Sequence, residues 1–153
     1  AWNPPADPEG GLRLVPGWAI VTNGSHTEPI AEKVASGMPI RDALALSLMA
    51  LDYEKDDYNT PRIACAVKAG GETGVLGVVR HDGLNVHELP LGPSQCFYLA
   101  TYEINDVCTS QTDTFDVADA DAAARYVIDG GKFAELVVGA AGGTVCVVVA
   151  IVG

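Results

Sequence analysis

The hydrophobic periodicity changes along the chain in an order that limits the fold more than any other feature. Apolar residues first recur at spacings of four, four and three, at Ile40, Leu44, Leu48 and Leu51. This spacing places them on one face of an α-helix. From residue 62 the pattern becomes one of short apolar runs separated by turn residues, which is typical of β-strands. Helices followed by a group of strands predict an α+β fold rather than alternating βαβ units.

The same apolar and turn patterns predict the positions of the strands and helices. Strands are predicted on either side of Pro16-Gly17 within residues 12–22, and at 62–69, 74–80, 84–89, 96–104 and 144–152. Helices are predicted at 27–36, 40–56 and 117–128, the first with Thr27 as its N-cap. Asp82-Gly83 predicts a β-hairpin, and residues 105–116 predict a polar loop. We expect one domain over residues 1–153, a length that suits a single hydrophobic core.

The charge balance argues against two classes of partner. Asp and Glu number 20 against 9 Lys and Arg, which gives a net charge of −11. Nucleic acids and anionic membrane surfaces are bound through Lys and Arg, so neither is expected here. The opening residues are polar and rich in proline, without the basic and apolar regions of a signal peptide. A cytoplasmic location is therefore expected.

The cysteines give little sign of a metal site. Cys65, Cys96, Cys108 and Cys146 contain no C-x-x-C pair, and no two are within ten residues of each other. A disulfide remains an alternative, although a chain of this size does not need one. We expect reduced thiols, with Cys65 and Cys146 as small core residues, and no metal.

Two polar stretches contain groups that the fold does not obviously require. Residues 22–27 join a strand end to a helix start, where free N–H groups suit an anion or a carbonyl oxygen. Residues 51–62 combine carboxylates with Lys55 and Arg62. Asp52 and Lys55 are three apart and could share a helix face, while Glu54 points elsewhere. Such a mixture suits proton transfer. An ordinary capped turn and a solvated helix end are the alternatives, and spacing alone leaves them open.

A third stretch, residues 100–103, ends an apolar strand. Alternation would send Tyr102 and Glu103 to opposite faces of that strand. The alternative is an ordinary strand terminus. The chain has no Ser-His-Asp arrangement, P-loop, H-E-x-x-H or G-x-G-x-x-G pattern, so no common catalytic motif decides among these stretches.

Four chained motifs carry a family resemblance. They are N-G-S-H at 23–26, R-D-A at 41–43, D-Y-E-K-D at 52–56 and N-T-P-R-I-A at 59–64, with looser agreement at 82–84, 101–103, 120–128 and 130–134. With these motifs the chain resembles the archaeal IMP cyclohydrolases over roughly residues 12–134. The resemblance implies a four-layer αββα sandwich similar to the N-terminal-nucleophile hydrolases, without their self-cleavage.

The resemblance also implies an activity. The carboxamide nitrogen of 5-formamidoimidazole-4-carboxamide ribotide attacks the formyl carbon, and loss of water gives inosine monophosphate (IMP), the last step of de novo purine biosynthesis. No metal or redox cofactor is implied. The expected partners are the nucleotide substrate, its product IMP and further copies of the chain in a homo-oligomer. On this basis we assign Glu54 to proton transfer and Lys55 to the developing oxyanion. The expected substrate-binding residues are Asn23, Ser25, His26, Asp52, Asn59, Thr60, Arg62, Tyr102 and Glu103, with Arg62 able to face phosphate.

The chain also departs from the family pattern. The family begins with a strand and a segment rich in Arg and Ser that are not found here, and the place of a Tyr-Asn pair holds Glu9-Gly10-Gly11. The sequence after Ala134 ends in a Val-rich run. We therefore expect an N-terminally truncated or divergent member. The alternatives are a degenerate homologue that binds a purine nucleotide without turnover, a structural subunit, or an unrelated enzyme of N-terminal-nucleophile architecture. The last is disfavoured because Ala1 offers no nucleophile.

Overall fold

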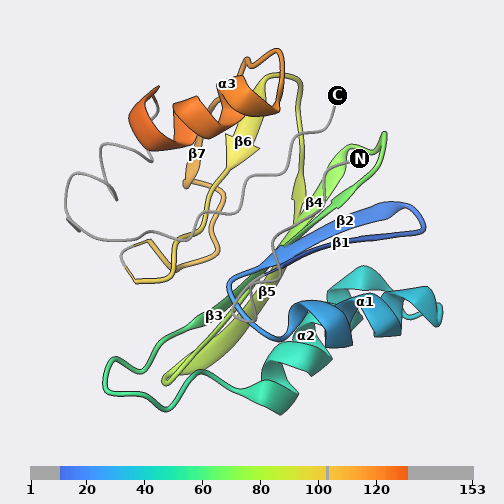
Figure 1. The fold of residues 1–153 in the computed structure, drawn as a ribbon, viewed down its shortest axis with the longest axis vertical. Helices are drawn as coiled ribbons and strands as arrows, with labels where there is room; N and C mark the ends of the chain where they lie inside the picture. Colours follow the sequence, from blue (N-terminus) through green and yellow to red (C-terminus); the bar gives the residue numbers. More distant parts are fainter. Residues whose placement is uncertain (1–10, 103, 131–153) are drawn as a thin grey trace.

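The computed structural model describes residues 11–102 and 104–130, and its main element is a five-stranded antiparallel sheet (Figure 1). The strands lie in chain order: β1 (Gly11–Val15), β2 (Trp18–Thr22), β3 (Arg62–Lys68), β4 (Thr73–Arg80) and β5 (Gly83–Pro90). Between β2 and β3 the chain forms α1 (Thr27–Ala35) and α2 (Ile40–Leu51). An antiparallel sheet with two helices between consecutive strands confirms the predicted α+β class.

Two tight hairpins set the register at the ends of this sheet. Gly17 turns the chain between β1 and β2 with φ +83°, a left-handed conformation that glycine adopts without steric cost. Arg80 pairs with Gly83, so the β4–β5 hairpin has His81 and Asp82 as its two loop residues. The predicted hairpin is present, and Gly83 is the first residue of β5 rather than part of the turn.

The two helices cover one face of the sheet. Ile30, Ala43, Leu44 and Leu48 pack against Ile20 and other residues of the strands in one buried cluster. Figure 1 shows α1 and α2 together on the same side of the sheet. The helical face predicted from the spacing of Ile40, Leu44, Leu48 and Leu51 is buried in this cluster except at Leu51, which is 40% exposed at the end of α2.

The opposite face of the sheet is also apolar. Ile63, Cys65 and Val67 alternate with the helix-facing positions of β3, and they form a second buried cluster that includes Leu99 and Val107. These last two residues lie between β6 (Gln95–Phe97) and β7 (Thr112–Thr114). The two strands pair with each other, and α3 (Ala120–Arg125) and a π-helical turn at Tyr126–Gly130 follow them. Figure 1 places this region across the sheet from α1 and α2. The central strands are therefore covered on both sides.

Five details of the predicted elements are wrong. Helix α2 ends at Leu51 rather than residue 56, because Asp52 adopts φ +60° and stops the helix. The strand predicted at 96–104 is formed only at Gln95–Phe97, and β7 lies inside the predicted loop 105–116. Helix α3 begins at Ala120, where Asp119 accepts a hydrogen bond from the Ala122 N–H as the N-cap. The N-cap of α1 is His26, and Thr27 is the first helical residue.

Some predictions fall on other parts of the chain. The strand at 144–152 and Cys146 lie outside the described residues. The other three cysteines are free thiols, and Cys65 is a core residue as predicted. Burial raises the pKa of Cys65 to about 12. Within residues 11–102 and 104–130, no helix is both long and apolar enough to cross a membrane.

Candidate functional site

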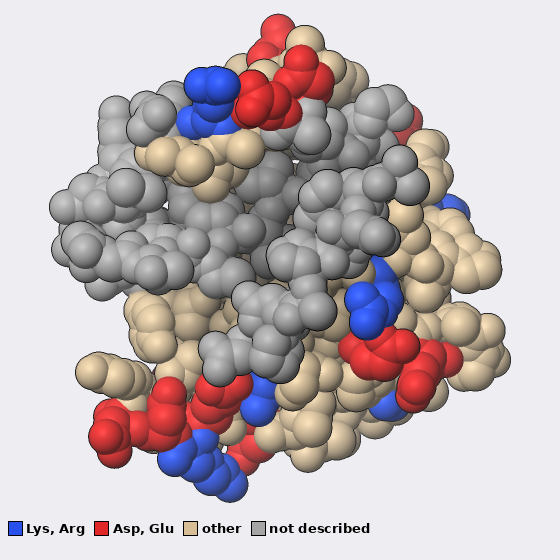
Figure 2. Space-filling model, in the orientation of Figure 1, with Lys and Arg blue, Asp and Glu red and all other residues tan. Residues whose placement is uncertain are grey.

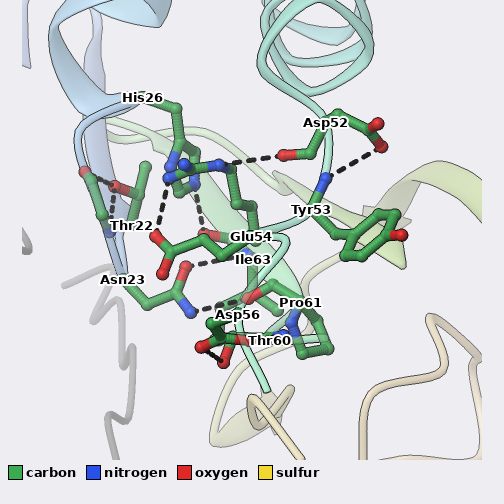
Figure 3. Close-up of polar contacts among 12 residues, drawn as sticks. Thr22, Asn23, His26, Asp52, Tyr53, Glu54, Asp56, Thr60, Pro61 and Ile63 are labelled. Carbon is green, nitrogen blue, oxygen red and sulfur yellow. Dashed lines mark hydrogen bonds and ion pairs between the residues drawn. The ribbon is translucent and has the colours of Figure 1, made fainter. Parts of the chain in front are cut away.

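Strand register brings the first two polar motifs together. Thr22 of β2 pairs with Ala64 of β3. One step further along, Asn23 lies beside Ile63, and its backbone N–H donates to the Ile63 carbonyl at 3.4 Å. The next step brings Gly24 beside Arg62. The turn after β2 and the loop before β3, far apart in sequence, therefore meet at one end of the sheet, as Figure 3 shows for His26 and Glu54.

The Asn23 side chain links three segments. Its Oδ1 accepts the Ile63 N–H at 2.9 Å, and its Nδ2 donates to the Pro61 carbonyl at 3.0 Å and to Thr101 Oγ1 at 3.3 Å. An amide group has two donors and one acceptor oxygen, so both donors are already used within the protein. Thr22 and Thr27 stabilise the same turn through the Gly24 carbonyl. Asn23 therefore holds the turn, the start of β3 and the segment near residue 101 together.

His26 is completely buried in this turn. Its Nε2 lies 2.8 Å from the Ile63 carbonyl, which only accepts, so Nε2 carries the proton and donates. Burial, opposed by this hydrogen bond and reinforced by the nearby Arg62 charge, lowers the His26 pKa to about 4. The imidazole is therefore neutral at neutral pH. Its Nδ1 has no hydrogen-bond partner among the described residues.

The loop between α2 and β3, residues 52–61, begins with a strained backbone. Asp52 has φ +60° and ψ 179°, a region that residues other than glycine rarely occupy. Its carboxylate accepts the Tyr53 N–H at 2.9 Å. Further along, Asp56 accepts from the Thr60 N–H and hydroxyl, and the Glu54 N–H donates to the Thr60 carbonyl at 2.8 Å. The loop is therefore closed on itself by backbone and carboxylate contacts.

Arg62, the first residue of β3, joins this loop to the turn. Its Nε donates to the Asp52 carbonyl at 2.9 Å, and its Nη1 lies 3.0 Å from Glu54 Oε1. The N–H of Nη1 is not aligned with that oxygen, so the second contact is an ion pair rather than a hydrogen bond. A Cβ atom on Gly24 would lie 2.9 Å from Nη1 and 3.3 Å from His26 Nδ1. Glycine therefore leaves room for the guanidinium, which a methyl group here would force to shift.

The two predicted catalytic side chains have different surroundings. Glu54 is 43% exposed and faces Arg62. Lys55 is 70% exposed, and its Nζ lies 3.2 Å from Asp52 Oδ2 and 5.9 Å from the centre of the Tyr53 ring. The predicted Asp52–Lys55 pair is present, but it forms in the loop and not on a helix face. Figure 2 shows acidic and basic side chains gathered at the end of the molecule where Figure 1 places this loop.

The remaining predicted residues lie in different places. Tyr102 lies at the loop, since its hydroxyl is 2.9 Å from Thr60 Oγ1. Asn59 is exposed with φ +50°, and Ser25 is exposed on the turn. Glu103 lies outside the described residues. Sequence reasoning did not single out Thr101 or Gly24; Gly24 stood inside the N-G-S-H motif, but nothing in the sequence showed that Arg62 would lie against it.

No group of three or more His, Cys, Asp or Glu side chains suited to a metal ion occurs among the residues that the structure describes. The site thus combines the Glu54 carboxylate and the Lys55 ammonium group on an exposed loop with a largely buried guanidinium and a neutral imidazole behind them. A carboxylate suits proton transfer, and an ammonium group suits a developing negative charge.

The comparisons with known proteins agree on one family. Residues 10–145 match a family described as IMP cyclohydrolase-like protein. The chain is 49% identical over 118 residues to the IMP cyclohydrolase of Methanocella arvoryzae, covering 77% of this chain and 56% of that protein. The corresponding protein of Methanosphaera stadtmanae is 46% identical over 116 residues, covering 76% and 54%. That of Haloarcula marismortui is 43% identical over 130 residues, covering 78% and 60%.

The chain spans a little over half of the length of these curated relatives. The matched residues include the turn, the loop and the start of β3, which are the segments that form the site. The resemblance seen in the chained motifs is thereby confirmed, and the chain belongs to the IMP cyclohydrolase-like family.

Proposed function

We propose that the protein closes the second ring of the purine base, converting 5-formamidoimidazole-4-carboxamide ribotide into IMP and water. The carboxamide nitrogen forms a bond to the formyl carbon, and the formyl oxygen becomes a hydroxyl group. One proton leaves the carboxamide nitrogen as that bond forms. A second leaves the formamide nitrogen as the new C=N bond forms, and both depart with the oxygen as water. The chemical step needs a proton acceptor near the nitrogen and a positive group near the oxygen.

One observation carries this proposal: the family's loop presents a half-exposed carboxylate next in sequence to an exposed ammonium group. Glu54 and Lys55 are adjacent residues with separate partners, Arg62 and Asp52. Since Oε2 of Glu54 has no hydrogen bond within residues 11–102 and 104–130, it is available to an incoming N–H. We assign Glu54 to proton transfer and Lys55 to the developing oxyanion.

The other predicted residues support this pair in two ways. Ser25, Asn59 and Tyr102 are exposed around the loop and the turn, where they suit contact with the ribotide. Asp52 and Thr60 shape the loop, through the Lys55 ion pair and the bond to Tyr102. Asn23 and His26 hold the site in place from inside the protein, because their polar groups bond to Pro61, Thr101 and Ile63. Closing a flexible molecule on itself gains much of its rate from such fixed surroundings.

The fold supports a finer proposal as well. The sheet has an apolar face on the side away from α1 and α2, and β6, β7 and α3 lie on that side. This order of helices, sheet, strands and helix supports the four-layer αββα sandwich that the resemblance implies. We propose that the protein has that sandwich and works as a homo-oligomer.

The test is turnover by the purified chain. The formamido ribotide is added, and IMP formation is followed by absorbance. We expect turnover by the parent chain, with kcat lowered about 10²–10⁴-fold by Glu54→Gln. For Lys55→Met we expect a loss of about 10²–10³-fold. Asp57→Asn, an exposed carboxylate on the same loop, and Lys68→Met, at the far end of β3, are matched controls that keep the parent rate.

Two outcomes would count against the proposal. Full rates in both Glu54→Gln and Lys55→Met would remove the catalytic assignment. Tight binding of IMP by the parent chain without turnover would favour the second candidate, a nucleotide-binding homologue. The positions of Asn23 and His26 support that candidate, because fixed side chains suit nucleotide binding as well as catalysis.

A further inference from the structure

Arg62 contacts the loop between α2 and β3 through its guanidinium. Its side chain is only 15% exposed, and the guanidinium is enclosed by the loop on one side and by Gly24 on the other. Arginine residues that bind a ligand phosphate present several N–H groups outward in a fork. Here Nε is used on the Asp52 carbonyl and Nη1 faces Glu54. The contacts therefore direct this cation toward the loop.

The contact with Asp52 holds the start of the loop. Asp52 has a backbone conformation that is unfavourable for a residue with a side chain, so other contacts must maintain it. The bond from Arg62 Nε to its carbonyl is one, and the bond from the Tyr53 N–H to its own carboxylate is another. Because Glu54 follows two residues later, the backbone of Asp52 helps to set where the Glu54 carboxylate points, together with the bond from the Glu54 N–H to the Thr60 carbonyl.

The contact with Glu54 leaves the carboxylate able to accept a proton. Nη1 approaches Oε1 to 3.0 Å, but its N–H is not aligned with the oxygen. The pair is therefore held by charge through Oε1, and Oε2 of Glu54 has no hydrogen bond within residues 11–102 and 104–130. Behind Arg62, the buried His26 ring is neutral, so it adds no second positive charge beside the guanidinium.

We propose that Arg62 is a positioning residue that holds Glu54 in its orientation for proton transfer, and that it does not contact the substrate phosphate. This rests on the proposed function, since Glu54 is there the proton acceptor. The planar fork is required, because an ammonium group cannot reach the Asp52 carbonyl and the Glu54 carboxylate with the same geometry.

The kinetic test uses Arg62→Lys alone and with Glu54→Gln. We expect Arg62→Lys to lower kcat roughly a hundredfold with little change in KM, as displaced catalytic groups do. In the Glu54→Gln background, Arg62→Lys should lower kcat no further, because the two residues act as one unit. A raised KM, or losses that multiply in the double variant, would show that Arg62 contacts the substrate and would overturn the proposal.

The second measurement does not depend on turnover. The guanidinium ¹⁵N–¹H resonances of Arg62 are recorded in the parent chain and in Glu54→Gln, with and without inorganic phosphate or IMP. Arg80, paired with Asp82 and Asp106, is the internal control. We expect the Arg62 signals to move with Glu54→Gln and to stay fixed when either ligand is added.

Signals that move when phosphate or IMP is added, or that ignore Glu54→Gln, would overturn the positioning role. If the parent chain makes no IMP, the proposed function fails, and these resonances still decide what Arg62 does. The two failures are therefore separable.

Discussion

The turn at residues 23–27 and the loop at residues 52–61 look alike in sequence but differ in the structure. Both are short polar segments between regular elements. The turn is largely buried, and its polar groups bond to Pro61, to Ile63 of β3 and to Thr101. The loop is exposed, begins with a strained residue, and carries Glu54 and Lys55 with part of their surface facing solvent. Register between β2 and β3 brings the two together.

This difference in burial separates residues that stabilise the fold from residues that are available for chemistry. A buried polar group that loses its partner costs free energy of unfolding, whereas an exposed side chain can be replaced with little effect on folding. We therefore expect changes in the turn to act mainly on stability and changes in the loop to act mainly on turnover. Four predictions sharpen this contrast.

The largest expected effect on stability comes from pH acting on His26. Its folded pKa of about 4 lies below the unfolded value of 6.5, so the neutral ring stabilises the protein above pH 6.5. This contribution is lost as pH falls toward 4, and it amounts to about 3 kcal/mol in the free energy of unfolding. Urea unfolding at pH 7 and pH 4 measures it.

The His26→Gln variant should lose this part of the pH dependence, because an amide does not titrate. His87→Gln, an exposed histidine of β5, should behave like the parent chain. An unchanged pH dependence in His26→Gln would mean that the imidazole is not held neutral by burial.

The second prediction concerns Asn23→Ala. This change leaves the Ile63 N–H and the Pro61 carbonyl without their side-chain partner in a buried position, which costs about 2–3 kcal/mol of unfolding free energy. Urea unfolding at neutral pH measures it, with Asn85→Ala on the exposed side of β5 as the matched control. Equal stability of the two variants would show that the turn does not hold these segments together.

The third prediction concerns the fit between Gly24 and Arg62. Gly24→Ala places a methyl group 2.9 Å from Nη1, and overpacking of this kind costs about 1–2 kcal/mol. Thermal unfolding measures the loss. Gly83→Ala is the control, because a Cβ there has nothing within 4 Å. A Gly24→Ala chain as stable as the control would mean that the guanidinium can move aside without cost.

The smallest expected effect on stability is that of Lys55→Met. Its ion pair with Asp52 is exposed, and such pairs contribute little to folding. We expect the midpoint of urea unfolding to stay at the parent value while kcat falls. A clear shift of the midpoint would place Lys55 with the stabilising residues of the turn and weaken the contrast between the two regions.

Much of the fold could be predicted from local patterns. The helical spacing from Ile40 to Leu48 and the strands around residues 62–90 were correct, because each period directly reflects one buried face. The end of α2 was missed, because the positive φ of Asp52 is imposed by its contacts and has no mark in the sequence. The strand predicted at 96–104 was too long, because an apolar run also suits a segment that covers a sheet.

The site was predictable as a set of motifs but not as an arrangement. The N-G-S-H and D-Y-E-K-D segments were found by resemblance. Spacing alone could not tell that His26 is buried and Lys55 exposed, because burial depends on the pairing of β2 with β3. For the same reason, nothing in the sequence showed that Arg62 lies between Gly24 and Glu54.

The most direct test compares Glu54→Gln with Asn23→Ala in kcat and in the urea midpoint. The account predicts that Glu54→Gln loses turnover about 10²–10⁴-fold while unfolding at the parent midpoint. Asn23→Ala should unfold at clearly lower urea and keep far more of its turnover at temperatures where it is folded. A Glu54→Gln chain that forms IMP at the parent rate would contradict the account.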